Sequence, residues 1–322
     1  MTDYLKKYDY TPDKDAIDRS LGIIAENVSK VTSPEVLKDC FSFMDLTTLR
    51  SNDTVASVTK LVNKVNGLKK EWPGYPMPAS ICVYPNFAST VREELLDPSV
   101  HVTTVASAFP STQSFLEVKV RECELAVEQG ADEVDIVLSL ANFLAGDYDA
   151  AAAEIRAMRK AIDVASARVG RPVVLKVILE TGLLVTPEAI ATASFLAMEE
   201  GADFIKTSTG KVEVNATPMA AYVMCACIRR FFEKTGRKVG FKAAGGISTA
   251  QDAAETDIVR DAVKNAALTC YAVEGAYPDS VDYLREHYHL AYDDDNYLIT
   301  YDAFASNMIP DIWVTEVGVG VQ

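Results

Sequence analysis

The sequence lacks a long apolar segment and the patterns that mark a protein for export. Its longest nearly apolar run, Met219 to Ile228, has ten residues, whereas a membrane-spanning helix needs about 20. The N-terminus MTDYLKKYDY has neither the apolar core nor the cleavage site of a secretory signal. We therefore expect a soluble, cytoplasmic protein that does not associate with membranes.

Metal-binding and disulfide patterns are also scarce. The 322 residues include only 3 His and 6 Cys, and no two cysteines form a CxxC pair. Because structural zinc sites take four ligands, mostly Cys and His, we expect no metal. Cys82 lies in an apolar run, and Cys225 and Cys227 lie in a helical pattern. This placement is typical of reduced thiols in a protein core.

Basic residues are few, and they are unevenly distributed. The net charge is −15, which argues against nucleic acid as a partner. Residues 251–322 contain 14 acidic and 3 basic residues, a net charge of −11, whereas residues 1–250 contain 32 acidic and 28 basic residues, a net charge of −4. The acidic charge is therefore mainly a property of the C-terminal quarter.

Short β-rich runs alternate with longer amphipathic stretches between residues 40 and 250. Several runs are almost continuously apolar, as parallel strands buried on both faces are. Thr186-Pro187 and Thr217-Pro218 place an N-cap before a proline at the first helical position. The predicted strands are 41–46, 80–84, 102–106, 133–138, 173–179, 204–207 and 239–242, and the predicted helices include 116–129, 150–169, 187–200 and 218–235.

Seven strand–helix units in series leave two main architectures, an open doubly wound sheet and a closed eight-stranded barrel. The sequence has no GxGxxG after an early strand, which disfavours a dinucleotide-binding sheet. Charged residues within apolar strands need a shared polar cavity, and the mouth of a barrel provides one. We predict a (β/α)8 TIM barrel over 41–322, with an N-terminal helical extension over 1–40 and an eighth strand after residue 290.

Two lysines on neighbouring predicted strands point to covalent chemistry. Lys206 ends one strand, and Lys242 lies on the next. Neighbouring parallel strands lie about 4.8 Å apart, so the two ammonium groups would lie close together in a partly desolvated mouth. Like charge and burial both favour a neutral amine. We therefore expect one lysine to have a depressed pKa and to act as a Schiff-base nucleophile.

Acidic and glycine-rich segments complete the predicted site. Asp135 lies deep in an apolar strand and is the candidate for proton transfer, and Lys176 either faces the same interior or pairs with Asp135. Asp45 is another acid on a predicted strand, and for it a structural role and a functional role stay equally open. Glycine-rich turns follow the sixth and seventh strands at Gly210 and at Gly245-Gly246, where barrels often bind phosphate.

Seven segments in order between residues 40 and 250 resemble the class I deoxyribose-phosphate aldolases. They are MDLTTL (44–49), ICVYP (81–85), GADEVDIV (130–137), LKVILETG (175–182), GADFIKTSTGK (201–211), VNATP (214–218) and GFKAAGGIS (240–248). The resemblance implies a (β/α)8 fold and reversible cleavage of 2-deoxy-D-ribose 5-phosphate to D-glyceraldehyde 3-phosphate and acetaldehyde. It implies no metal or organic cofactor, and a tendency to form homodimers.

The resemblance also implies roles for individual residues. Lys206 would form the Schiff base, Lys242 would lower its pKa, and Asp135 would transfer protons. The residues implied to bind the substrate and its phosphate are Lys211, Gly210, Gly245, Gly246, Asp45 and Thr209.

The family pattern is absent after residue 250. The nearest equivalent of the family's last phosphate loop is NYLITYDAFAS (296–306), which carries an acid in place of the expected basic and glycine residues. Two alternatives therefore stay open beside the phosphosugar lyase. One is an aldolase for non-phosphorylated deoxy sugars or simple aldehydes, and the other is a catalytically silent barrel that acts as a binding protein.

Overall fold

The computed structural model describes residues 3–31, 33–245, 278, 280–288, 290, 297–302 and 311–316. The chain separates into two compact units, Met1–Gly246 and Ile247–Gln322.

The first unit is built on a sheet of seven parallel strands that follow one another in chain order. Each strand pairs with the next, and the strands are short and largely buried, which explains their continuous apolar sequence. The strands are β1 (Asp45–Thr47), β2 (Ser80–Val83), β3 (His101–Val105), β4 (Glu133–Val137), β5 (Val174–Ile178), β6 (Phe204–Lys206) and β7 (Gly240–Lys242).

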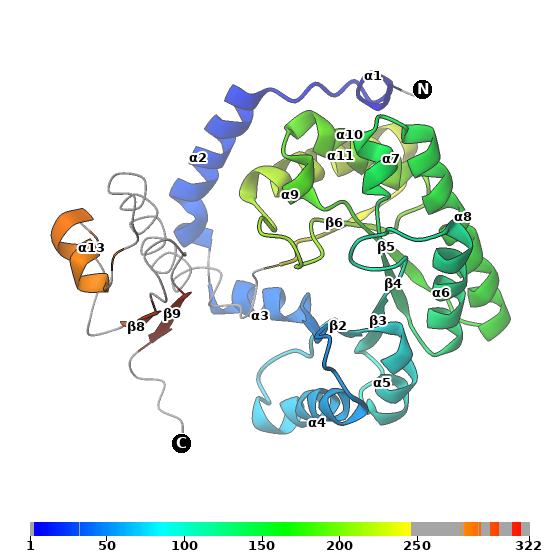
Figure 1. The fold of residues 1–322 in the computed structure, drawn as a ribbon, viewed down its shortest axis with the longest axis horizontal. Helices are drawn as coiled ribbons and strands as arrows, with labels where there is room; N and C mark the ends of the chain where they lie inside the picture. The colour runs from blue at the N-terminus through cyan, green and yellow to red at the C-terminus, as the bar shows by residue number, and fades with distance from the viewer. Residues whose placement is uncertain are drawn as a thin grey trace. The chain divides into compact units, whose positions relative to one another are not determined.

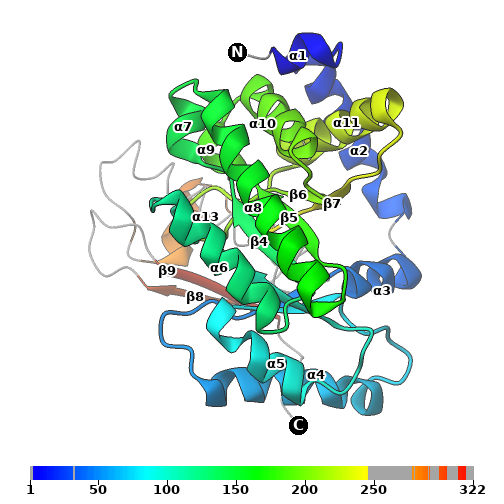
Figure 2. The ribbon, with the colours of Figure 1, turned by 90° about the vertical axis from the view of Figure 1, so that its right-hand side faces the viewer.

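Helices connect these strands and surround them (Figures 1 and 2). The predicted helix starts are confirmed: the side chains of Thr186 and Thr217 accept hydrogen bonds from the first turns of α10 and α11. The helices are α4 (Val55–Glu71), the 3-10 turn η1 (Pro85–Phe87), α5 (Ala88–Glu94), α6 (Leu116–Glu128), α7 (Leu140–Leu144), α8 (Tyr148–Val169), α9 (Thr181–Leu184), α10 (Pro187–Glu199) and α11 (Pro218–Thr235).

The sheet curls so that its first and last strands approach each other. The Lys242 Nζ at the end of β7 lies 2.8 Å from Asp45 Oδ1 on β1. Lys211 Nζ, after β6, donates to the carbonyl of Leu49, after β1, at 2.7 Å. These contacts cross the gap between the edge strands of the sheet. The TIM-barrel-like (β/α) fold class predicted from the sequence is confirmed.

The chain before β1 is helical and consists of α1 (Tyr4–Lys7), α2 (Lys14–Val31) and α3 (Pro34–Ser42). Tyr8 stacks on Phe195 of α10 with ring centroids 4.3 Å apart, which fixes α1 to the outer helices. The predicted strand 41–46 is partly wrong, because α3 continues to Ser42 and β1 begins only at Asp45. Ser33 caps α3 at Pro34, so the helix has a defined start.

The second unit contains α13 (Val281–Tyr288), β8 (Tyr297–Asp302) and β9 (Asp311–Glu316). β8 and β9 form an antiparallel pair, whereas a strand that closes the barrel would pair in parallel. The predicted barrel strand after residue 290 is therefore wrong for these two segments. The domain bounds 1–40 and 41–322 stay a prediction. No helix among the described residues combines the length and apolarity that crossing a membrane requires.

The cysteines follow the core prediction only in part. Cys82 and Cys227 are buried, and so is Cys123, but Cys225 is exposed on the outer side of α11. Cys225 and Cys227 are two residues apart in a helix, so their side chains point in different directions. The prediction of a core position for Cys225 is therefore wrong.

Candidate active site

The predicted site residues lie on several strands of the sheet: Lys206 and Lys242 end their strands, Asp135 and Lys176 lie at the centres of β4 and β5, and Asp45 begins β1. Lys206 and Lys242 are the last residues of β6 and β7 and are paired in register. Asp135 of β4 pairs in register with Lys176 of β5. Parallel strands present their carboxyl ends at one end of the barrel, which is where barrel enzymes hold their catalytic groups.

Lys206 and Asp135 form the centre of the site. Lys206 Nζ donates to Asp135 Oδ2 at 2.6 Å. Asp135 is fully buried and Lys206 is 8% exposed, so water screens their interaction little. A hydrogen bond between two charged groups in such surroundings is short and strong. The pair therefore has the geometry for direct proton exchange between the amine and the carboxylate.

Lys176 connects Asp135 to a second acid. Its Nζ lies 3.0 Å from Asp135 Oδ1 and also forms an ion pair with Glu133 Oε2. The predicted pairing of Lys176 with Asp135 is thus confirmed. Glu133 continues the network outward, because its Oε1 lies 2.6 Å from Nδ1 of the half-exposed His101. Asp135 is therefore shared between two ammonium groups, one from Lys176 and one from Lys206.

Lys242 is held by a different acid from the one that holds Lys206. Its Nζ lies 2.8 Å from Asp45 Oδ1 and donates to the Phe43 carbonyl at 2.6 Å. Asp45 Oδ2 also lies 3.5 Å from Lys176 Nζ. The pKa of Asp45 is lowered: burial opposes the shift, but Lys176 and Lys242 outweigh it. Asp45 therefore acts here as a charged partner of two lysines.

The expected depression of the Lys206 pKa is wrong for this arrangement of the site. Burial would lower the pKa of Lys206, but the carboxylates around it, Asp135 first, outweigh burial and raise it. The Asp135 carboxyl responds in the opposite sense: burial would raise its pKa, but Lys176 and Lys206 lower it. In this state Lys206 is an ammonium ion next to a carboxylate, with a proton acceptor already in contact.

The loop after β6 brings together most of the predicted phosphate-binding residues. Gly210 and Gly245 have positive φ angles of 76° and 87°, a conformation that favours glycine. A Cβ atom on Gly210 would lie 3.8 Å from the Gly245 Cα, so the two turns approach each other. Thr209 accepts from the Lys211 N–H at 3.1 Å. Gly246 lies outside the described residues.

Sequence reasoning missed Glu180, a buried acid that contacts the site. Glu180 is 2% exposed, and its carboxylate accepts from the Thr209 backbone N–H at 3.1 Å and from its hydroxyl at 2.5 Å. The position of Glu180 directly after the apolar run LKVIL (175–179) was the sequence signal that could have identified it. Cys82 is fully buried in β2, and burial raises the pKa of its thiol to about 12.

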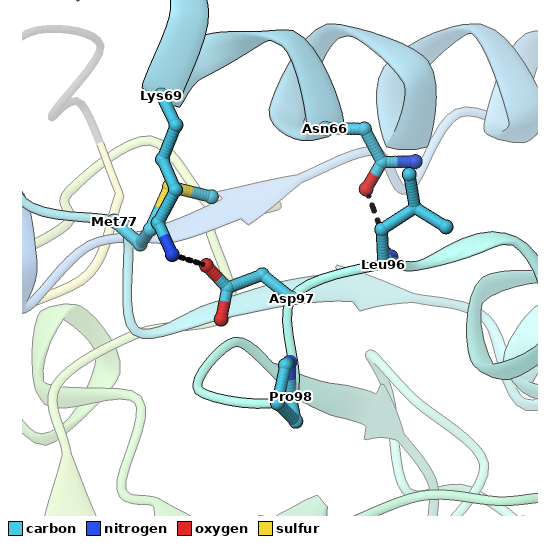
Figure 3. A pocket seen from close by; sticks show the side chains of 6 residues that line it. All are labelled: Asn66, Lys69, Met77, Leu96, Asp97 and Pro98. Atoms are coloured by element: carbon cyan, nitrogen blue, oxygen red, sulfur yellow. Dashed lines mark hydrogen bonds and ion pairs between the residues drawn. The ribbon is translucent and has the colours of Figure 1, made fainter. Parts of the chain in front are cut away.

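A separate hollow of about 200 Å³ lies at the opposite end of the strands. Its lining includes Met77, which precedes β2, and Leu96, which precedes β3. Figure 3 shows that its polar groups are already paired: Lys69 Nζ lies 2.6 Å from Asp97 Oδ2, and Asn66 accepts from the Leu96 N–H.

Among the described residues, no group of three or more His, Cys, Asp or Glu side chains could hold a metal ion.

A TIM-barrel-like sheet that holds a buried lysine–aspartate pair fits an aldehyde-lyase of the aldolase type, and the comparisons with known proteins show that class. Residues 41–276 match the DeoC/LacD family aldolases, and the chain belongs to this family.

Individual relatives agree with this assignment. The chain is 42% identical to the deoxyribose-phosphate aldolase of Agrobacterium fabrum, over 66% of this chain and 75% of that protein. It is 41% identical to the human deoxyribose-phosphate aldolase, over 66% of this chain and 67% of that protein. The tetrameric deoxyribose-phosphate aldolase of Aeropyrum pernix shares the fold, with a TM-score of 0.56 at 24% identity over 75% of this chain and 88% of that chain.

Proposed function

We propose that this protein cleaves 2-deoxy-D-ribose 5-phosphate reversibly to D-glyceraldehyde 3-phosphate and acetaldehyde through a Schiff base on Lys206. The contact between Lys206 Nζ and Asp135 Oδ2, at 2.6 Å in a buried setting, carries this proposal. The substrates of the Agrobacterium and human relatives, as their names give them, support the choice of sugar.

The geometry supports a sequence of proton transfers. Asp135 takes a proton from the Lys206 ammonium, and the neutral amine adds to the C1 aldehyde of the sugar. Loss of water gives a cationic imine, which accepts the electron pair of the C2–C3 bond as that bond breaks. The C3 hydroxyl loses its proton to a base and becomes the aldehyde of glyceraldehyde 3-phosphate. The enamine left on Lys206 is protonated and hydrolysed to acetaldehyde.

Lys176 and Lys242 support this chemistry through the charges they place around it. Lys176 holds Asp135 from the side opposite to Lys206 and favours its carboxylate form. Lys242 ends the neighbouring strand and is anchored by Asp45. This anchoring holds the Lys242 amine on the strand adjacent to Lys206.

Turnover of the phosphorylated and the free sugar tests this function. We expect cleavage of 2-deoxyribose 5-phosphate, measured as glyceraldehyde 3-phosphate released, with a larger kcat/KM than for 2-deoxyribose. Lys206→Met should abolish both reactions, and Lys160→Met, at an exposed position in α8, should change neither. A preference for the free sugar would instead favour the non-phosphorylated alternative, and no turnover of either would favour a silent barrel.

We also propose that the protein acts in the cytoplasm and forms a homodimer. The free cysteines of the described residues support action in the reducing cytoplasm. Homodimer formation was implied by the family resemblance, and light scattering on the purified protein tests it.

A further inference from the structure

Residues 180–182, between β5 and α10, contact the loop that follows β6. We define the β6 loop as residues 207–217, which carry Thr209, Gly210 and Lys211. We propose that Glu180 is a positioning residue that holds the β6 loop in the shape that receives the substrate phosphate, and so determines the preference for a phosphorylated sugar. This inference rests on the proposed function.

The carboxylate of Glu180 uses both of its oxygens on one residue of the loop. Oε1 accepts from the Thr209 backbone N–H at 3.1 Å, and Oε2 accepts from the Thr209 hydroxyl at 2.5 Å. Glu180 is 2% exposed. A buried carboxylate costs free energy unless it is hydrogen-bonded, so the loop is held where these two donors meet it.

The hydrogen bonds of Thr209 connect Glu180 to Lys211. The Thr209 hydroxyl has one proton and gives it to Glu180, so a lone pair of its oxygen is available to the Lys211 N–H, 3.1 Å away. Lys211 Nζ is then fixed by the Leu49 carbonyl at 2.7 Å. Glu180 thus orients both the backbone and, through it, the side chain of the cationic residue of the loop.

The backbone around Glu180 is shaped for this contact. Glu180 has φ 55° and ψ 58°, a left-handed conformation that residues other than glycine rarely adopt. The next N–H, of Thr181, donates to the Thr207 carbonyl at 2.9 Å. A Cβ atom on Gly182 would lie only 2.0 Å from the Val214 carbonyl oxygen. Three successive residues therefore contact the β6 loop, at Thr207, Thr209 and Val214.

Variants of the two hydrogen-bonded residues test the proposal. Glu180→Gln keeps the shape but presents an NH2 group to one of the two Thr209 donors, and Thr209→Val removes the hydroxyl. Each should raise KM for 2-deoxyribose 5-phosphate about tenfold, the effect of losing one charge-assisted hydrogen bond, with a smaller change in kcat. Combined, the two changes should have less than their multiplied effect, because they remove the same contact.

The controls separate positioning from general damage. Glu188→Gln changes an exposed acid in the first turn of α10 and should stay close to the unchanged protein. The ratio of KM for the phosphorylated sugar to KM for free 2-deoxyribose should rise in Glu180→Gln. An equal loss with both sugars, or a ratio equal to that of Glu188→Gln, would overturn the proposal.

A second measurement does not depend on the sugar. Trypsin should cleave native Glu180→Gln after the exposed Lys211 several times faster than it cleaves the unchanged protein, with cleavage after Lys160 as the internal reference. Equal rates would also overturn the proposal. Failure of the proposed function is distinguishable, because it would appear in the unchanged protein as the absence of a borohydride-trapped acetaldehyde adduct on Lys206.

Discussion

Buried ionic groups make the site sensitive to acid. Lys176 and Lys206 lower the pKa of Asp135 against the effect of burial, below its usual value of 3.8. A carboxyl group with a lower pKa in the folded protein stabilises the fold at a pH above the unfolded value. That stability is lost as the pH falls through the folded value. The acid limb of the stability curve therefore contains a contribution from Asp135.

We expect the free energy of unfolding to fall more steeply between about pH 5 and pH 2 in the unchanged protein than in Asp135→Asn. The asparagine cannot take up a proton, whereas the other acids, including Asp45, are common to both proteins. Urea unfolding at a series of pH values measures the difference. Parallel curves for the two proteins would show that Asp135 is not held as a carboxylate by the lysines.

Thiol reactivity reports the burial of the cysteines one by one. The pKa of Cys82 is raised by burial to about 12, and that of Cys123 is raised still further. The thiolate is the reactive form, and Cys40 and Cys225 are exposed. Iodoacetamide at about pH 8 should therefore label Cys40 and Cys225 in the native protein and leave Cys82 and Cys123 unlabelled, as peptide mass mapping would show. Labelling of Cys82 in the native state would contradict the described packing around Lys206.

Among the elements, β6 and β7 pack closely against each other at their first residues. A Cβ atom on Gly240 would lie 2.1 Å from the ring of Phe204, its partner in the register that aligns Lys206 with Lys242. Gly240→Ala should therefore destabilise the protein by about 1–3 kcal/mol through overpacking, and should lower kcat. Thermal unfolding and turnover measure the two effects.

A glycine with free space provides the matched control. Gly22 lies within α2 and has nothing within 4 Å of an added Cβ atom. Gly22→Ala should stabilise the protein by roughly 0.5–1 kcal/mol, because alanine is the better helix former. If Gly240→Ala were equally stabilising, the close packing of β6 against β7 would be wrong.

The elements also show what sequence alone could and could not predict. Lys206, Asp135 and Lys176 lie in apolar runs with a clear strand pattern, so their convergence in the interior of a barrel followed from the fold class. The pairing of Lys242 with Asp45 did not, because these residues lie on the last and first strands of the sheet and meet only when it curls. The direction of the Lys206 pKa shift was wrong for the same reason, since it depends on which acid each lysine contacts.

At the scale of the whole molecule, the N-terminal helices complete the outer layer of the first unit. Tyr8 is 3% exposed and stacks on Phe195 of α10. We expect Tyr8→Ala to destabilise the protein by about 3 kcal/mol, in the range for loss of a buried aromatic ring. Phe115→Ala, at a ring that is 77% exposed, should change stability by about 0.5 kcal/mol or less. Urea unfolding of both variants checks this, and equal effects would mean that α1 is not docked.

Charged residues are distributed unevenly between the two units. The first unit holds the lysine–carboxylate network, whereas residues 251–322 hold most of the net negative charge. The match to the family model ends at residue 276, within this acidic segment. Lys206, Asp135, Lys176 and Lys242 all lie in the first unit.

Trapping with acetaldehyde and sodium borohydride tests the central claim most directly. The proposed mechanism predicts one ethyl group on the peptide that contains Lys206, absent in Lys206→Ala and unchanged in Lys160→Ala. Peptide mass mapping identifies the modified lysine. An ethyl group on a different lysine in the native protein, or none at all, would contradict the assignment of Lys206 as the Schiff-base residue.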